Sequence, residues 1–171
     1  MLAMTVSLNE SYSIEIRAAN ELDKGETDNI IKLLRDGGAV SVSSARREIP
    51  LIQLMTVVRQ KSEIVGFGAI KGIREGYAES IQRKSNFHFD KRIAELGYVV
   101  VADGHQGHHL SSHIVENLVA GSQNNLFATT DSVRMQHCLK KVGFKKCGGK
   151  WKGNRNPLSL WLLTHDLQES E

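Results

Sequence analysis

The chain has 171 residues and a formal net charge of +3 at pH 7, with 40% hydrophobic and 24% charged residues. This composition is typical of a folded domain and excludes a disordered chain. The sequence contains no run of about 18 apolar residues, so no membrane span is predicted. The length fits one domain over residues 1–171 with a sizeable core. The two cysteines, Cys138 and Cys147, cannot build a disulfide framework, and they favour a reducing, cytoplasmic setting.

The first half of the chain contains three strand-like segments and one helix-like segment. Alternating apolar and polar residues, or short apolar runs between turn residues, are typical of strands. Apolar residues that recur every three to four positions behind a capping residue are typical of helices. In chain order the patterns predict a strand over 13–18, a helix from the capping residues 20–23 to Gly37 and Gly38, a loop over 43–50, and a β-hairpin of strands 51–58 and 63–70 around the turn 60–62.

Two parts of this half have an open interpretation. Gly66 and Gly68 lie inside the second hairpin strand, which indicates either a bulge or the close approach of another backbone. Residues 71–91 are polar apart from a few apolar side chains. Tyr77 and the segment 87–89 either cover one face of the sheet or belong to a flexible substrate loop.

The second half begins with the most informative stretch of the chain. The β-branched residues Val99, Val100 and Val101 belong to a strand over 93–102, and helical spacing of apolar residues starts at Leu110. A helix that begins directly after a strand presents unpaired N–H groups and the positive end of its dipole at the turn, which suits phosphate oxygens. The remaining patterns predict a strand over 125–130, a helix over 132–142, and a final pair of strands over 145–151 and 158–164.

The order β, α, β, β, β, α, β, α, β, β predicts a mixed α/β (α+β) fold, with a mostly antiparallel central sheet of six to seven strands flanked by helices. Together with two motifs, this order resembles the GNAT superfamily of acyl-CoA-dependent N-acyltransferases. The hexapeptide QGHHLS at 106–111 matches the family's Gln/Arg-x-x-Gly-x-Gly/Ala. The segment LKKVGF at 139–144 matches the family's helix end of lysine, an apolar residue, Gly and Phe. The resemblance covers residues 60–163 well.

The resemblance implies that acetyl-CoA is bound and that backbone amides after the strand hold its pyrophosphate. In that arrangement the strand edge at Val99, Val100 and Val101 pairs with the pantetheine amides and meets the thioester oxygen. The residues that the resemblance assigns to the turn and the first helical turn are Gln106, Gly107, His108, His109, Leu110, Ser111 and Ser112.

Two of these positions depart from the family pattern. His109 stands where the family has Gly, and Ser111 stands where it has Gly or Ala. Glycine lets a phosphate approach the backbone closely and adopts a positive φ without strain, so both substitutions bear on the affinity for coenzyme A.

Glu95 is the predicted general base. It lies eleven residues before Gln106, where many members of the family keep a catalytic Glu. On a regular strand its side chain shares a face with Val99 and Val101. The alternative is a solvated strand residue or an ion-pair partner.

The general acid is less well defined. Many family members carry a Tyr on the late helix that protonates the leaving thiolate, and Leu139 occupies that position here. Tyr98, Ser132 and Cys138 are the remaining side-chain candidates, and water is the alternative. Because general acid catalysis contributes about 10²–10⁴-fold, the missing Tyr does not abolish the chemistry.

Two further groups of residues have alternative interpretations. His109 and His113 are one helical turn apart, a spacing that can bind a metal, but no Cys or carboxylate completes a ligand set, so no metal is predicted. Seven basic residues lie between Lys140 and Arg155 without an acid among them. They form either a solvated surface or a contact with a phosphorylated cofactor or an anionic macromolecule.

The leading hypothesis is an N-acetyltransferase that moves an acetyl group from acetyl-CoA to a primary amine of a small molecule or protein, by direct attack in a ternary complex. One alternative is a non-catalytic acyl-CoA-binding or regulatory module on the same fold. Another is an RNA-interacting protein or an aminoacyl-tRNA acetyltransferase that uses Lys140–Arg155. Because dimers are common in the family, the resemblance is also compatible with a homodimer.

Overall fold

The computed structural model describes residues 4–7, 11–38 and 40–165, which belong to two compact units. Unit 1 contains the chain up to Gly72 together with Leu96–Ser122, and unit 2 contains Ile73–Glu95 together with the chain from Gln123 onward. In the part that is described, no helix is long and apolar enough to cross a membrane. The expectation of one domain over 1–171 stays a prediction.

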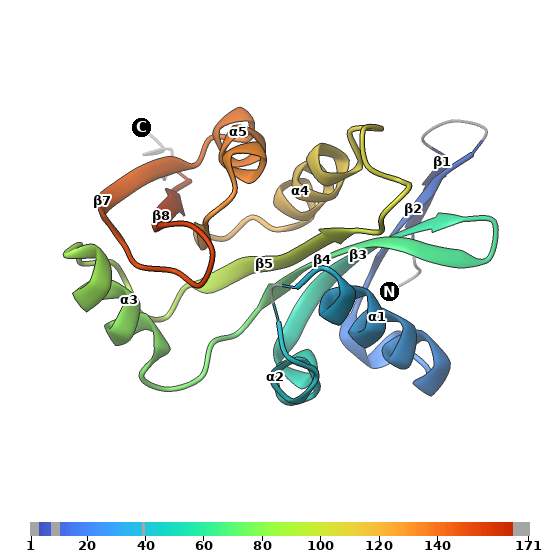
Figure 1. Ribbon diagram of the computed structural model, residues 1–171, viewed down its shortest axis with the longest axis horizontal. Coiled ribbons are helices and arrows are strands. Elements are labelled where there is room, and N and C mark those ends of the chain that lie inside the picture. Colours follow the sequence, from blue (N-terminus) through green and yellow to red (C-terminus); the bar gives the residue numbers. More distant parts are fainter. Residues whose placement is uncertain (1–3, 8–10, 39, 166–171) are drawn as a thin grey trace, which may run out of the picture. The chain divides into compact units, whose positions relative to one another are not determined.

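Within the described ranges the chain forms eight strands, five α-helices and two 3-10 helices (Figure 1). The strands are β1 (Met4–Ser7), β2 (Ser13–Arg17), β3 (Ile52–Gln60), β4 (Glu63–Lys71), β5 (Ala94–Val101), β6 (Leu126–Thr130), β7 (Lys145–Trp151) and β8 (Leu158–Leu163). The helices are η1 (Ala19–Glu21), α1 (Lys24–Asp36), α2 (Val42–Glu48), η2 (Ile49–Leu51), α3 (Tyr77–Ser85), α4 (Leu110–Gly121) and α5 (Val133–Lys141).

The strands are hydrogen-bonded in the order β1-β2-β3-β4-β5-β6-β8-β7. Neighbours in β1-β2-β3-β4 and in β6-β8-β7 are antiparallel, whereas β5 pairs with β6 in parallel, with Ala94 opposite Leu126 and Glu95 opposite Phe127. This is the predicted mixed α/β class with its parallel crossover. The sheet has eight strands instead of six to seven because the short segment Met4–Ser7 pairs with β2.

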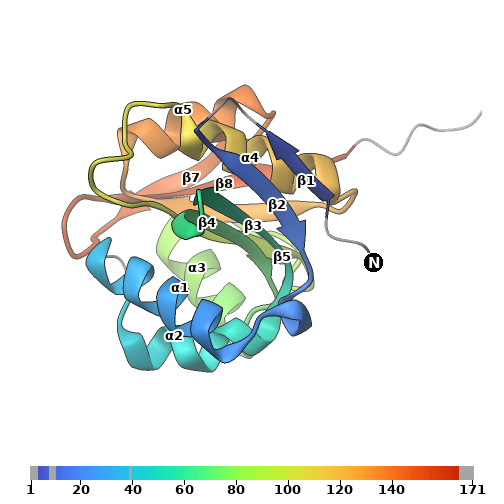
Figure 2. The same cartoon turned by 90° about the vertical axis from the view of Figure 1, so that its right-hand side faces the viewer.

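In unit 1, helices cover both faces of the strands. Helices α1 and α2 lie against one face, and α4 lies against the other face of β3 and β4 (Figures 1 and 2). On the α1–α2 side, Ile30 and Leu34 of α1 belong to the same buried cluster as Met55, Val57 and Phe67 of the hairpin. The predicted hairpin, the strand before α1, and α1 itself are all confirmed.

Close packing of α4 explains the two glycines of β4. A Cβ on Gly68 would collide with the side chain of Ile114, and a Cβ on Gly66 would lie 3.1 Å from Val58 Cβ. The close approach predicted from these glycines is therefore made by side chains of α4 and β3, not by another backbone. The register of β3 and β4 also shifts between Val58 and Arg59, so the hairpin contains an irregularity as well.

Unit 2 has a core of its own. Ala78 and Ile81 of α3 pack with Phe89, with Phe127 of β6 and with Leu160 of β8. The segment 71–91 thus contains a helix that covers strands of this unit, which is the first of the two interpretations considered for it.

One expectation from the sequence is wrong. Residues 43–50 are not a loop, because α2 occupies most of them. Its N-cap Ser41 accepts a hydrogen bond from the Ser44 backbone N–H at 3.2 Å, and its one buried side chain is Ala45. The helix predicted over 132–142 is confirmed as α5, and its first residue, Val133, is 69% exposed. The first turn of that helix faces solvent, and the buried positions are Cys138 and Leu139.

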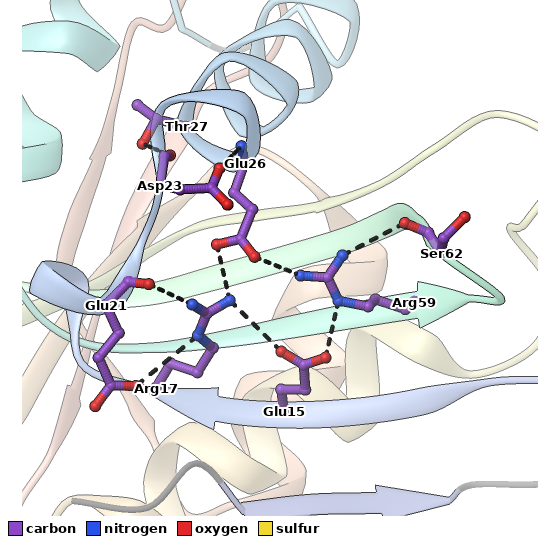
Figure 3. A network of polar contacts seen from close by, with 8 residues as sticks. All are labelled: Glu15, Arg17, Glu21, Asp23, Glu26, Thr27, Arg59 and Ser62. Atoms are coloured by element: carbon purple, nitrogen blue, oxygen red, sulfur yellow. Dashed lines mark hydrogen bonds and ion pairs between the residues drawn. The ribbon is translucent and has the colours of Figure 1, made fainter.

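Helix α1 is joined to β2 and β3 by an arginine–glutamate network of Glu15, Arg17, Glu21, Glu26 and Arg59 (Figure 3). The Glu26 carboxylate accepts from Arg17 Nη1 at 2.9 Å and from Arg59 Nη2 at 3.0 Å, and Glu15 accepts from Arg59 Nε at 2.8 Å. The hydrogen bond to Glu26, with the charges of Glu26, Glu15 and Glu21, raises the pKa of Arg17 above its ordinary value although burial opposes the shift. The network ties the start of α1 to β2 and β3.

Candidate functional site

Strand β5 is irregular in its middle. Tyr98 has a φ of 57°, in the left-handed region that costs an L-residue about 1–2 kcal/mol, and an aromatic residue rarely adopts it. Tyr98 and Val100 pack against the cluster that contains α1, whereas Val99 Cγ2 lies 3.4 Å from the Cβ position of Gly68, on the α4 side. Tyr98 and Val99 therefore face opposite sides. The left-handed Tyr98 interrupts the regular strand between Glu95 and Val99, and the shared face of Glu95, Val99 and Val101 stays a prediction.

The turn between β5 and α4 contains three residues with left-handed backbone. Gly104, Gly107 and His109 have φ values of 86°, 88° and 59°. Left-handed residues between right-handed ones turn successive N–H groups toward one concave side, a geometry that binds anions. His109 occupies the fourth position of the sequence motif, so the conformation for which the family uses glycine is present here in a histidine. Histidine is among the residues that tolerate it better than most.

The start of α4 differs from the starts of three other helices. Asp23, Ser41 and Ser132 each cap their helix with a side-chain oxygen, whereas the N-cap residue of α4, His109, makes no side-chain cap hydrogen bond. The first N–H groups of a helix need an acceptor from outside the helix. At α4, as at α3 with its N-cap Gly76, the N-cap side chain does not supply one.

The predicted cofactor-binding residues all lie in unit 1. The side chains of the turn are exposed, Leu110 is buried and anchors the first turn of α4, and the remaining residues are half-buried. The exposed residues are Gln106, Gly107, His108 and His109, and the half-buried ones are Val99, Val100, Val101, Ser111 and Ser112.

A buried tyrosine that sequence reasoning missed contacts this turn. Tyr12 is 5% exposed, and its hydroxyl forms a 3.0 Å hydrogen bond with His105 Nδ1. Its ring also packs edge-on against His105 and at a tilt against His108, with centroid distances of 5.9 and 5.5 Å. The first residue of the turn is held as well, since Ala102 N–H donates to Val65 O at 2.8 Å. Tyr12 is 93 residues from His105 in the chain, and no local pattern links them.

A second missed group surrounds Tyr98. Its hydroxyl donates to Glu48 Oε2, and the Lys71 ammonium lies 3.1 Å from the same oxygen and 4.2 Å from the centroid of the Tyr98 ring. We call Glu48, Lys71 and Tyr98 the tyrosine cluster. Lys71 is 5% exposed, which is rare for a lysine. Glu48 is the last residue of α2, where the sequence predicted a loop, so the carboxylate could not be placed beforehand.

The predicted catalytic residues other than Tyr98 lie in unit 2. Glu95 is 6% exposed, in the part of β5 that pairs with β6. The Ser132 hydroxyl caps α5 by accepting from Met135 N–H at 3.3 Å, and Cys138 of the same helix is buried and forms no disulfide. Each of these two residues has a structural role that explains its presence, and their catalytic roles stay predictions.

The remaining charged and metal-binding candidates add little to the site. Between Lys140 and Arg155 the lysine side chains are exposed, and Arg155 pairs with Asp131 at 3.3 Å. Among the described residues, no group of three or more His, Cys, Asp or Glu side chains could hold a metal ion. His113 instead lies 3.8 Å from Glu116, one helical turn away.

Comparison with known proteins identifies the fold. No protein-family model matches the chain, and no relative is found among curated proteins. Solved structures do match. A GNAT-family acetyltransferase from Streptococcus agalactiae is similar with a TM-score of 0.67 at 17% identity, covering 90% of this chain and 96% of its own. At these levels of identity the similarity shows the fold alone.

Two other similar structures were solved with bound ligands. A GNAT-family acetyltransferase from Elizabethkingia anophelis has acetyl-CoA bound and matches with a TM-score of 0.60 at 11% identity, covering 92% of this chain and all of its own (100%). Arabidopsis thaliana NAA60, in complex with a bisubstrate analogue, matches with a TM-score of 0.60 at 10% identity, covering 88% and 97%.

Proposed function

We propose that this chain, which has the GNAT fold, transfers an acetyl group from acetyl-CoA to a primary amine. The observation that carries the proposal is the β5–turn–α4 segment. It has left-handed backbone at Gly107 and His109 and a helix start without a side-chain cap, on a fold whose similar structures include one with acetyl-CoA bound. These features suit the binding of a diphosphate by backbone N–H groups.

In this proposal the pyrophosphate of acetyl-CoA lies against the backbone of Gln106–Ser112. Tyr12 supports that turn from the protein interior through His105 and His108. The strand edge at Val99–Val101 offers backbone groups to the pantetheine amides and to the thioester oxygen, where developing negative charge is stabilised by N–H donors. A site built from backbone groups explains why His109 can replace a glycine: the requirement is a conformation, and the histidine meets it.

The chemistry is a direct acyl transfer. The amine nitrogen attacks the thioester carbonyl carbon, a C–N bond forms, and the C–S bond breaks as coenzyme A leaves. Glu95 accepts the proton that the amine loses, and the thiolate takes a proton from Tyr98, Ser132, Cys138 or water. The burial of Glu95 at 6% exposure supports its role, because few water molecules can compete with the amine for a buried carboxylate.

The acceptor is a small molecule or a protein that carries a primary amine, and the cytoplasm is the proposed location. The full-length chain should release free thiol from acetyl-CoA when it is assayed against a panel of polyamines, amino acids, aminoglycosides and peptide N-termini. Acetyl-CoA should also raise the melting temperature, since a ligand that binds only the folded state stabilises it. Stabilisation without thiol release would favour the non-catalytic acyl-CoA-binding module, and the absence of both would contradict the proposal.

A further inference from the structure

We propose that Glu48 and Lys71 are positioning residues that hold Tyr98 in its left-handed conformation and thereby orient the backbone of Val99–Val101. The inference rests on the proposed function only for what those backbone groups bind. Glu48, Lys71, Tyr98 and Val99–Val101 all belong to unit 1. They come from three elements: the end of α2, the end of β4 and the middle of β5.

The backbone of Tyr98 has a conformation that is unusual for a bulky residue. Left-handed conformations of bulky residues persist only where the surroundings enforce them, and they concentrate at functional sites. Gly97 immediately precedes Tyr98 and could adopt a positive φ without strain, yet the conformation is found at the aromatic residue. The position of the tyrosine side chain, and not backbone freedom, therefore decides where β5 departs from regular geometry.

The side chain of Tyr98 is held by two residues, Lys71 and Glu48. The Tyr98 ring lies beneath the Lys71 ammonium, and its hydroxyl donates to the carboxylate oxygen that Lys71 contacts at 3.1 Å. The ring is thus fixed at its face and at its tip by two residues that are themselves paired. Side-chain exposures of 7% for Lys71 and 19% for Glu48 show that water competes little for these contacts.

The Glu48–Lys71 ion pair is better suited to position Tyr98 than to stabilise the fold. A buried ion pair loses hydration that its mutual attraction does not reliably recover, so apolar residues of similar size would hold α2 on β4 at least as well. An ionic pair is nevertheless suited to hold a phenol at its oxygen, because charged hydrogen-bond acceptors are directional and strong. The tyrosine cluster is therefore better explained by the geometry that it imposes on β5 than by the stability that it adds.

The left-handed conformation of Tyr98 affects the three residues that follow it, Val99–Val101. A left-handed residue in a strand changes the direction in which the next peptide groups point, in the manner of a β-bulge, and bulges often occur beside active sites. The peptide groups after Tyr98 are those of Val99–Val101, which the proposed function assigns to the acyl-pantetheine. The tyrosine cluster would then set the angle at which they meet the thioester.

The test uses the full-length chain with Glu48→Gln, Tyr98→Phe and the double variant. Arg46→Gln is the matched control, because Arg46 lies on α2, is 58% exposed at its side chain, and pairs only at the surface with Asp28 at 3.3 Å. The first measurement is amide hydrogen exchange of Val99–Val101, with Val57 and Phe67 as monitors of the core. The second measurement is kcat and KM for acetyl-CoA with the best amine.

Both single variants should speed exchange at Val99–Val101 but not at Val57 and Phe67, and should lower kcat by about 10²-fold with little change in KM, since a small misplacement of reacting groups has effects of that size. The double variant should lose no more than the larger single loss, because both changes act through one hydroxyl. Arg46→Gln should change neither measurement. If Glu48→Gln unfolds the chain, Tyr98→Phe, which keeps the ring and the ion pair, decides the question.

Unchanged exchange at Val99–Val101 in Tyr98→Phe would overturn the inference, and so would faster exchange without loss of kcat. Additive losses in the double variant would also overturn it, because they would mean that Glu48 acts independently of Tyr98. Failure of the proposed function gives a different result: the unaltered chain would release no thiol with any amine, while the exchange measurements would still show whether the cluster holds β5.

Discussion

Two groups of charged side chains in unit 1 use similar chemistry for different purposes. The arginine–glutamate network joins α1 to β2 and β3, and none of its members has a left-handed backbone, although Arg59 lies at the register shift of the hairpin (Figure 3). The tyrosine cluster joins α2, β4 and β5, and one of its members has a left-handed backbone. Similar ion pairs thus have different structural roles. The network fixes the position of helix α1, whereas the cluster fixes the left-handed backbone of Tyr98 in β5.

Replacing Glu95, the proposed base, should lower kcat more than a change in either the network or the tyrosine cluster. Glu95→Gln should lower kcat by about 10²–10⁴-fold, the usual contribution of a general base, because the amide cannot accept the proton of the attacking amine. The affinity for acetyl-CoA, measured by calorimetry, should stay nearly unchanged.

Glu63→Gln, an exposed change at the start of β4, is the matched control for charge and should leave turnover as it is. Turnover of Glu95→Gln equal to that of the unaltered chain would show that Glu95 is not the base. A loss smaller than that of Glu48→Gln would mean that the tyrosine cluster lies closer to the chemistry than the comparison of the two groups allows.

Arg59→Met should affect stability and not chemistry. Arg59 is 17% exposed at its side chain and donates to both Glu15 and Glu26, so its loss should lower the free energy of unfolding by about 1.5–3 kcal/mol, the usual range for hydrogen bonds to charged groups. Urea denaturation measures this change, and kcat at a temperature well below unfolding should remain that of the unaltered chain. A fall in kcat without a fall in stability would erase the distinction between the two groups.

Tyr12→Phe should have a moderate effect that is confined to cofactor binding. It removes the hydrogen bond to His105 but keeps the ring that packs against His108. A neutral hydrogen bond contributes about 0.5–1.5 kcal/mol, which corresponds to a Kd for coenzyme A that is about 2–12-fold weaker. Calorimetry with coenzyme A measures this change, and a reduced kcat at saturating acetyl-CoA would contradict it.

The smallest effect is expected for the exposed lysines of β7. Lys145 and Lys146 are exposed on β7, so replacing both with alanine should change the Kd for coenzyme A by less than about twofold, because exposed charges are screened by salt. Calorimetry with coenzyme A at low and high salt checks this. A loss of affinity beyond tenfold would make the basic segment part of the cofactor site, and strongly salt-dependent retention on RNA would revive the nucleic-acid alternative.

The sequence predicted well where local patterns decide the structure. The valine run before Leu110 and the glycines of the turn were enough to place β5, the turn and α4, because periodicity and turn chemistry are local. Helix α2 was missed because its sequence, VSSARRE, carries almost no apolar face, and only Ala45 is buried. Its cap and its packing on α1, rather than its pattern, account for it.

The site was predictable only in its backbone part. His109 was recognised as an unusual residue at a glycine position, and the structure shows that it adopts the glycine-like conformation. The left-handed Tyr98 could not be predicted, because propensity opposes it and its partner Glu48 lies 50 residues away in a segment that reads as a loop. Interactions between distant residues enforce this geometry, and no local pattern records them.

The lysines of β7 have a consequence for how copies of this chain meet. β7 is the last strand in the order of the sheet, so one of its edges has no neighbouring strand among the residues described. An unprotected edge can recruit a strand from another molecule and start aggregation. Here Lys145 and Lys146 are exposed, and the register with β8 shifts between Cys147 and Trp151. Positive charge and a broken register both oppose strand addition, so this edge should discourage self-association even at high concentration.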